Sequence, residues 1–413
     1  MAKPKIRFKG YTDDWEQRKF GDDNDLITGY PFESEKFSEE GIKLVRGMNV
    51  KRGYLDFSND ICMRWNSTDG LENYLLEADD ILIQMDGALI GKSYAKIAEE
   101  QLPALLVQRV TRARTRSKDA CTDFMYQTIQ RDFLRYIGMN KTETAVPHLS
   151  LNDIYNFKIM VPCLEEQQQI GAYFSNIDNL ITLHQRKCEE TKKLKKYMLQ
   201  KMFPKNGQTV PEIRFAGFTD AWEQRKLGDL VDRVTRKNQD LVSELPLTIS
   251  AQYGLIDQNE FFEKRVASKD VSGYYLIENG EFAYNKSTST DAPWGAVKRL
   301  DRYENGVLST LYIVFGIKEN NPVDSDFLVS YYSTNLWHKG IHEIAAEGAR
   351  NHGLLNIAPA DFFETELTIP QDIEEQKKIG KYFEELERLI TLHQHKCEQL
   401  QSMKKFMLQN MFV

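Results

Sequence analysis

The sequence has few cysteines and no long apolar run, and each shortage excludes a class of protein. Its five cysteines are scattered, odd in number and never spaced as CxxC, which favours free thiols over a disulfide framework. No apolar run approaches the ~18 residues that span a bilayer. The first twenty residues contain no apolar core of a secretory signal. We therefore expect a cytoplasmic protein without a membrane segment.

Basic residues are also too few to outweigh the acidic ones. The 54 Lys and Arg against 61 Asp and Glu give a formal net charge of -7. Taken alone, this balance counts against a nucleic-acid binder, for which a basic surface is the usual footprint. With 41% hydrophobic and 28% charged residues the composition is that of a folded chain. Its 413 residues suggest two to four domains.

No catalytic motif is complete. The stretch DGALIGKS at 86–93 resembles a phosphate-binding loop, but Asp86 stands where the first glycine is required. The stretch NNPVD at 320–324 lacks the second proline and the aromatic residue of an adenine methyltransferase motif. His338 and His342 lack the glutamate of a zinc-binding HExxH helix, and no GxSxG occurs. We therefore expect no catalytic centre in this chain.

Two segments of the chain occur twice. Residues 6–22 and 213–229 are identical at thirteen of seventeen positions, at an offset of 207. Residues 165–203 and 374–412 are identical at 23 of 39 positions, at an offset of 209. Two such matches at nearly one offset indicate a tandem duplication, with its boundary near 204–212. The stretches between the repeats diverge, which suggests one scaffold carrying two different readers.

The repeated C-terminal segments are predicted to be long helices. Apolar residues recur at alternating spacings of four and three, as at Ile170, Phe174, Ile177 and Ile181, which is the seam of a coiled coil. The divergent bodies carry β-branched and aromatic runs broken by Gly, Asn and Asp, with further helices at 123–137 and 326–337. We predict an α+β fold class: two β-rich mixed domains joined by two long antiparallel coiled-coil helices, in a pseudo-twofold tandem repeat.

The first body carries a concentrated basic cluster in RVTRARTRSK. On a strand, residues spaced by two share one face, and a basic face suits phosphates. The alternative is a solvated edge strand, which Lys and Arg also protect. Lys92 and Ser93 stand in a nearby turn. The candidates of the first body are Lys92, Ser93, Arg109, Arg112, Arg114, Arg116 and Lys118.

The second body interleaves hydroxyls, cations and an aromatic residue in NKSTSTDAPWGAVKR at 285–299. Such a set suits phosphates and base edges, and EGARN at 347–351 offers an arginine for a bidentate base contact. The alternatives are a polar loop with Trp294 as its packing anchor, and a plain loop. The candidates of the second body are Lys286, Ser287, Thr288, Trp294, Lys298, Arg299, Arg350 and Asn351.

One further cluster lies on the long helices. His184 and Cys188 share one helical face, as do His393 and Cys397. If the helices cross there, the four residues could offer two His and two Cys to a zinc ion. The alternative, which we favour, is that small polar residues fix the register of closely crossing helices, with no metal.

The repeats resemble the DNA-specificity subunit of type I restriction–modification enzymes. The resemblance covers essentially the whole chain, and its helix motifs are specific. It rests on IRFxGxTDxWEQRKxGD at 6–22 and 213–229, on VPCLEEQQQIG at 161–171 and IPQDIEEQKKIG at 369–380, and on the closing segments at 144–154 and 349–359.

The resemblance implies four parts and a division of labour. Each recognition domain would read one half of a bipartite, asymmetric double-stranded DNA sequence. The helices would set the gap between the half-sites and dock two modification subunits, which two restriction subunits would join. The parts are a first target-recognition domain at 1–160, a central helical spacer at 161–205, a second target-recognition domain at 206–368 and a C-terminal helical spacer at 369–413.

The resemblance implies no cofactor in this chain. The modification subunits would hold S-adenosylmethionine and methylate adenine, and the restriction subunits would use ATP and Mg. Two other hypotheses stay open from the residues alone: a non-enzymatic adaptor that binds protein or glycan, and an autonomous enzyme. Binding driven by phosphates weakens steeply with added salt, whereas binding through an apolar adaptor interface does not. The salt dependence of binding therefore separates the DNA-specificity subunit from the adaptor.

Overall fold

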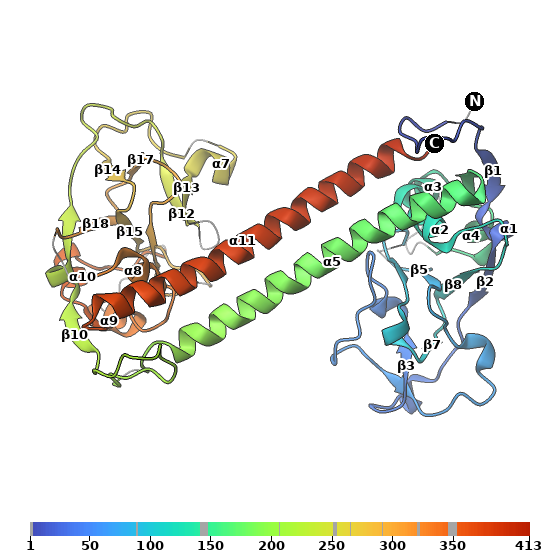
Figure 1. Cartoon of the computed structure of the whole chain (residues 1–413), viewed down its shortest axis with the longest axis horizontal. Coiled ribbons are helices and arrows are strands. Elements are labelled where there is room, and N and C mark those ends of the chain that lie inside the picture. Colours follow the sequence, from blue (N-terminus) through green and yellow to red (C-terminus); the bar gives the residue numbers. More distant parts are fainter. Residues whose placement is uncertain are drawn as a thin grey trace. The chain divides into compact units, whose positions relative to one another are not determined.

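The computed structural model describes residues 3–413 apart from 88–89, 141–147, 206, 251–253, 265, 291, 320–322 and 346–352. The chain forms two compact units (Figure 1). Unit 1 comprises Met1–Gln185 and His395–Val413, and unit 2 comprises Arg186–Gln394. None of the helices in the described ranges is both long and apolar enough to cross a bilayer.

Unit 1 combines short strands with short helices. Its sheets have the strand orders β2-β8-β5-β6, β4-β3-β7 and β1-β9. The strands are β1 (Glu16–Lys19), β2 (Asn24–Thr28), β3 (Ile42–Val45), β4 (Arg64–Trp65), β5 (Ile81–Gln84), β6 (Tyr94–Lys96), β7 (Ala104–Leu106), β8 (Val110–Thr115) and β9 (Lys158–Val161). The short helices are α1 (Phe20–Asp23), α2 (Thr122–Thr128), α3 (Leu134–Asn140) and α4 (Leu151–Tyr155).

Unit 2 likewise combines short strands with short helices. Its sheets have the strand orders β11-β18-β15-β16, β12-β13, β14-β17 and β10-β19. The strands are β10 (Glu223–Lys226), β11 (Val231–Val234), β12 (Leu247–Ser250), β13 (Gly254–Asp257), β14 (Tyr275–Glu278), β15 (Phe282–Asn285), β16 (Ala296–Arg299), β17 (Asn305–Leu308), β18 (Ile313–Ile317) and β19 (Glu366–Ile369). The short helices are α6 (Leu227–Leu230), α7 (Gln258–Phe262), α8 (Ser325–Tyr331), α9 (His338–Ile344) and α10 (Pro359–Phe363).

The two four-stranded sheets have the same topology although their sequences diverge. In each, the strand after the short first helix pairs antiparallel with a strand from much later in the body. That later strand, β8 or β18, pairs in turn with the first strand of a hairpin, β5 or β15. Ile81 of β5 faces Ala113 of β8, and Phe282 of β15 faces Phe315 of β18. This register makes each position of one sheet equivalent to a position of the other.

The repeated sequences pin each body to the start of a long helix. Arg7 donates to both carboxylate oxygens of Glu166 at 2.7 and 2.8 Å, and Arg214 does the same to Glu375 at 2.6 and 2.7 Å. The side chain of Glu166 is 0% exposed and that of Glu375 is 1% exposed. A buried carboxylate needs such a partner, which explains why both residues recur in the repeat.

The glutamine that follows each of these glutamates is used identically in the two units. Gln167 donates to the carbonyl of Pro162 at 2.9 Å and accepts from the amide of Cys121 at 3.1 Å. Gln376 donates to Pro370 at 2.8 Å and accepts from Asp324 at 2.8 Å. Each glutamine therefore joins the first turn of a long helix to the residue that precedes α2 or α8.

The two long helices are α5 (Leu164–Lys201), green in Figure 1, and α11 (Ile373–Asn410), red. In unit 1 the first part of α5 packs on the last part of α11. Lys404 forms an ion pair with Asp178 at 2.6 Å, and the thiol of Cys397 lies 3.7 Å from the carbonyl oxygen of Ile181. The residue numbers rise along one helix as they fall along the other, so the helices are antiparallel.

Unit 2 repeats this packing with the helices exchanged. Lys195 forms an ion pair with Glu387, and the thiol of Cys188 lies 4.0 Å from the carbonyl oxygen of Ile390. The predicted fold class, with β-rich mixed bodies and two long antiparallel helices, is confirmed. The zinc alternative for the His and Cys cluster finds no support: within the described ranges, no three His, Cys, Asp or Glu side chains are placed to hold a metal ion.

One predicted helix is longer than the observed one. The segment 123–137 is helical throughout, with a π-helical turn at Ile129–Phe133 between α2 and α3. The segment 326–337 is helical only to Tyr331, where α8 ends. The hydroxyl of Thr334 donates to the carbonyl of Tyr331 at 2.7 Å and accepts from the amide of Leu336 at 3.2 Å. A side chain that bonds the local backbone in this way competes with the helix.

Each unit is completed by the end of a long helix. The amide of Ile6 donates to the carbonyl of Asn410 at 2.8 Å, and that of Ile213 donates to Lys201 at 2.9 Å. Just beyond these turns, Phe412 packs in the core of unit 1 and Phe203 in the core of unit 2. The long helices therefore contribute to the cores as well as to the connection.

Candidate nucleic-acid interface

Three segments of unit 1 meet at one end of its four-stranded sheet. They are the turn after β5, the turn before β8 and the stretch before α4. Asp86 forms a β-bridge with His148, the amide of Met85 donates to the carbonyl of Arg109 at 2.9 Å, and Arg109 Nη1 donates to Asp86 Oδ2 at 2.8 Å. We call Asp86, Arg109 and His148 the unit 1 tip.

The side chain of Arg109 projects into solvent at this tip. It is 68% exposed, whereas Asp86 is 21% exposed. The backbone of Arg109 has φ +69°, a left-handed conformation that few residues other than glycine adopt. The side-chain amide of Gln84 donates to the carbonyl of Asp86 at 2.9 Å and so stabilises the turn after β5. The tip therefore presents a guanidinium to solvent on a turn that is held at several points.

The neighbouring candidates of unit 1 differ in accessibility. The side chain of Lys92 is exposed to solvent. Ser93 is buried, and its carbonyl accepts from the amide of Gln84 at 3.1 Å within the sheet. Of this pair, only the lysine reaches the surface.

Two arginines of the basic cluster lie inside the fold. Arg112 is 4% exposed and forms an ion pair with Asp25 of β2. Arg114 donates to both oxygens of the buried Asp80 at 2.7 Å and pairs with Glu77. Burial lowers the pKa of Arg112. β8 lies between β2 and β5, so the edge-strand alternative is wrong. Both guanidinium groups are occupied by carboxylates of unit 1.

The remaining basic residues of the cluster lie at the opposite end of β8 from Arg109. The side chain of Arg116 is exposed and lies 3.6 Å from Asp25, and Lys118 is exposed. The cluster that looks continuous in sequence is therefore divided into one arginine at the tip, two internal arginines and two cations at the far end.

Unit 2 has an equivalent tip at the same end of its sheet. Ser287 forms a β-bridge with Leu354, as Asp86 does with His148. Thr288 donates to the carbonyl of Gly353 through its amide at 2.7 Å and through its hydroxyl at 3.1 Å. The ammonium of Lys286 lies 3.5 Å from the carbonyl of Ile357. The predicted hydroxyl loop therefore meets the segment that precedes α10.

Trp294 and Lys298 are partly enclosed. The ring of Trp294 packs against the core of unit 2, with its centroid 4.9 Å from that of His342. The hydroxyl of Tyr284 donates to the carbonyl of Trp294 at 2.9 Å, as expected of a packing anchor. Burial, with Lys195 close by, lowers the pKa of Lys298.

Arg299 has a counterpart in unit 1 that defines its task. Arg299 forms an ion pair with Asp326 in the first turn of α8 at 2.7 Å. Lys96, at the same position of β6, forms an ion pair with Asp123 in the first turn of α2 at 2.5 Å. In both units a cation at the sheet edge therefore fastens the following helix. Arg350 and Asn351 lie outside the described residues.

The structure adds Leu311 to the tip of unit 2. Thr111 faces Ile83 in unit 1 and Ile313 faces Tyr284 in unit 2, so the residue two positions before each is equivalent. Leu311, 55% exposed, is therefore the counterpart of Arg109 in the register, although its backbone does not share the left-handed conformation of Arg109. Sequence reasoning missed Leu311, because a single leucine in a divergent body carries no signal. It also missed Asp86 and His148, for which the only signal was that they lie in or beside motifs already noted.

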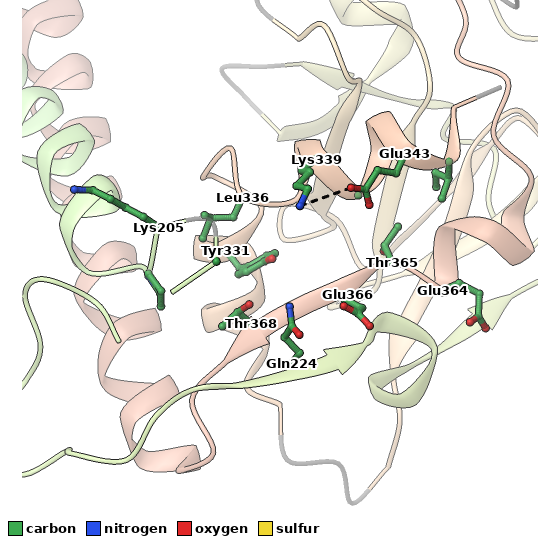
Figure 2. Close-up of a pocket in the computed structure, with 14 residues that line it drawn as sticks. Lys205, Gln224, Tyr331, Leu336, Lys339, Glu343, Glu364, Thr365, Glu366 and Thr368 are labelled. Atoms are coloured by element: carbon green, nitrogen blue, oxygen red, sulfur yellow. Dashed lines mark ion pairs between the residues drawn. The ribbon is translucent and has the colours of Figure 1, made fainter. Parts of the chain in front are cut away.

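A pocket in unit 2 lies between the β10–β19 pair and α9, with a volume of about 270 Å³ (Figure 2). Lys339 points toward Glu343 and forms an ion pair with it at 3.7 Å. Glu364 and Glu366 also line the pocket. The three glutamates of the lining outnumber its two lysines, Lys205 and Lys339, so we assign the pocket no role in DNA binding.

Comparison with known proteins identifies the scaffold. The family model for the type I restriction modification DNA specificity domain matches residues 12–193 and again 219–402. The EcoAI specificity subunit of Escherichia coli, a type I restriction enzyme subunit, is 28% identical over 169 residues, which cover 40% of this chain and 28% of that protein. The MjaVIII specificity subunit of Methanocaldococcus jannaschii is 25% identical over 190 residues, 45% of each chain.

The fold is also that of a solved specificity subunit. The S subunit of the type I restriction-modification system of M. genitalium superposes with a TM-score of 0.65 over 100% of this chain and 99% of that one, at 14% identity. The matched regions span less than half the length of these two curated relatives. The family model, in contrast, accounts for most of the chain in two successive copies. The chain therefore belongs to the type I restriction modification DNA specificity domain family.

Proposed function

We propose that this chain is the specificity subunit of a type I restriction–modification system and that each unit binds one half of a bipartite, asymmetric DNA target. One observation carries the proposal. The two units present equivalent tips on the same sheet topology, but the tips differ in chemistry. Equivalent supports with different side chains suit two different half-sites, since base contacts specify a sequence while the scaffold only positions them.

The exposed candidates are the natural DNA contacts of such a surface. Cations that reach solvent neutralise DNA phosphates, and hydroxyls donate to them. Ser93, Arg112, Arg114 and Arg299 serve the fold, so we leave them out of the proposed interface. The proposed contacts are Lys92, Arg109, Arg116, Lys118, Lys286, Ser287 and Thr288.

This chain selects the DNA sequence that the complex binds, and its partner subunits catalyse the reactions. Two modification subunits would hold S-adenosylmethionine and methylate adenine, and two restriction subunits would add ATP- and Mg-dependent cleavage. The net charge of -7 is compatible with this arrangement if the DNA surface is a small part of the exterior and the partners provide much of the affinity.

Exchange of one body tests the reading of half-sites. Replacing residues 230–368 by the corresponding body of another family member should change one half of the methylated motif and leave the other half intact. The measurement is sequencing of methylated adenines in a host that carries the complete operon. Exchange of residues 23–160 is the reciprocal control and should change the other half. If either exchange altered both halves, the units would not read independently.

Exposed apolar residues recur at equivalent places on the long helices. Leu194 and Tyr197 of α5 in unit 2 correspond, at the offset of 209, to Met403 and Phe406 of α11 in unit 1. Residues three apart share one helical face. Exposed apolar surface that is repeated in both units suits docking of two copies of one partner, and we assign these pairs to the modification subunits.

Glutamate substitutions test this docking. Tyr197→Glu should remove one modification subunit from the purified assembly, Phe406→Glu should remove the other, and the double variant should retain neither, because a charge in an apolar interface is costly. The mass of the complex reports the number of subunits. Lys193→Glu, an exposed change on the same helix, should leave two bound. A double variant that still binds both subunits would exclude these surfaces.

A further inference from the structure

We infer that the two units read different base features: Arg109 reads a guanine in the half-site of unit 1, and Leu311 contacts a thymine methyl in the half-site of unit 2. The inference rests on the proposed function, because it assumes that both tips enter a major groove. It adds the chemical class of one base in each half-site, which follows from the two exposed residues that occupy equivalent positions in the register.

The geometry of Arg109 suits guanine. The guanidinium has five N–H donors, Asp86 takes one through Nη1, and the side chain is 68% exposed, so the other donors are accessible to a ligand. Guanine presents two acceptors, O6 and N7, on its major-groove edge, and a bidentate arginine is their commonest partner. Adenine and thymine each present one acceptor there and cytosine presents a donor, so none of them matches the fork as well.

The surroundings of Arg109 restrict it before any DNA is present. Asp86 is held by the bridge to His148 and by the donor from Gln84, and the left-handed backbone of Arg109 fixes where its side chain leaves the turn. A phosphate contact needs no such restriction, because a flexible lysine or arginine suffices. Ordering the side chain in advance reduces the entropy lost on binding, which favours the demanding geometry of a base contact.

Leu311 presents the opposite chemistry at the equivalent register position. It is exposed, and among the described residues of unit 2 it belongs to none of the apolar core clusters. Its side chain offers neither donor nor acceptor, so it cannot bond a phosphate or a polar base edge. The C5 methyl of thymine is the apolar feature of the major groove.

Base analogues test each contact at single atoms. The probe is the methylation site found by sequencing, bound by the full chain assembled with its modification subunits. Replacing one guanine of the first half-site by 7-deazaguanine, which lacks the N7 acceptor, should weaken binding roughly tenfold to hundredfold. Replacing one thymine of the second half-site by uracil, which lacks the methyl, should weaken binding about fourfold.

The variants show which residue senses each atom. Arg109→Ala should bind the guanine and 7-deazaguanine sites equally, and Leu311→Ala should bind the thymine and uracil sites equally. Both side chains are exposed, so neither change disturbs a core. Arg116→Ala is the matched control: as a proposed phosphate contact it should weaken all sequences alike and preserve the full 7-deazaguanine effect.

The outcomes separate this inference from the proposed function. A wild-type assembly without sequence preference would refute the proposed function itself. A clear bipartite motif would uphold that function but overturn the inference if its first half lacked guanine or its second half lacked thymine. The inference would also fail if Arg109→Ala weakened every sequence alike with a shallower salt dependence, since that is the behaviour of a phosphate contact.

Discussion

Replacing Arg214 by alanine is expected to lower the free energy of unfolding of unit 2 by about 3–5 kcal/mol. The variant leaves the carboxylate of Glu375 buried without its bidentate partner. A buried charge that loses its counter-ion costs far more than an exposed pair contributes. Urea titration followed by hydrogen exchange along the chain would measure the loss and assign it to unit 2.

Two further variants isolate the cause. Lys226→Ala removes an exposed ion pair with Glu364 and should leave the free energy of unfolding almost unchanged, because solvent screens such a pair. Replacing both Arg214 and Glu375 by methionine removes the charges together and should recover most of the stability, because an apolar pair of similar volume needs no desolvation. An alanine variant within about 1 kcal/mol of the wild type would show that water or another donor satisfies Glu375.

Phe412→Ala is expected to destabilise unit 1 by about 3–5 kcal/mol. Substitutions at exposed positions are usually harmless. Here the ring is 4% exposed, stacks on Phe124 with centroids 5.2 Å apart and packs edge-on against Trp15 at 5.9 Å. Removing it leaves a cavity among aromatic rings that are fixed by other contacts. Urea titration followed by hydrogen exchange, which distinguishes the amides of unit 1 from those of unit 2, would measure the effect.

The duplication provides matched comparisons for this result. Phe203→Ala removes the equivalent ring of unit 2, which packs against Trp222 at 5.8 Å, and should destabilise unit 2 instead. Phe406→Ala changes an exposed ring of α11 and should alter stability by no more than about 0.5 kcal/mol. Equal effects of Phe412→Ala and Phe406→Ala would mean that the last turn of α11 frays from the core in solution.

The helices and the duplication were predictable because the repeat preserves both members of each contact. Arg7 with Glu166 and Arg214 with Glu375 recur as pairs, and the coiled-coil seam is periodic. The common sheet topology was not predictable, because backbone hydrogen bonds define it whatever the side chains are. Equivalent positions hold Arg112 in one sheet and Val314 in the other, so no identity survives to be recognised.

The site was only partly visible in the sequence for a related reason. Alternation along a strand places Arg112 and Arg114 on one face, but it does not show that Asp25 and Asp80 lie opposite them. These carboxylates come from distant parts of the chain, and only the tertiary fold brings them close. Leu311 illustrates the converse: its position, and not its residue type, makes it a candidate, and the position emerges only from the shared register.

The way in which unit 1 is assembled has a consequence for its synthesis. Unit 2 is one continuous stretch, whereas unit 1 combines the beginning of the chain with residues that follow all of unit 2. Phe412 and Asn410 are synthesised after every residue of unit 2, although they pack with Trp15 and bond Ile6 in unit 1. Unit 2 therefore has all of its residues before unit 1 does. Until Phe412 has been synthesised, the aromatic side chains around Trp15 lack this ring, and an exposed aromatic surface is a target for chaperones and a site of aggregation.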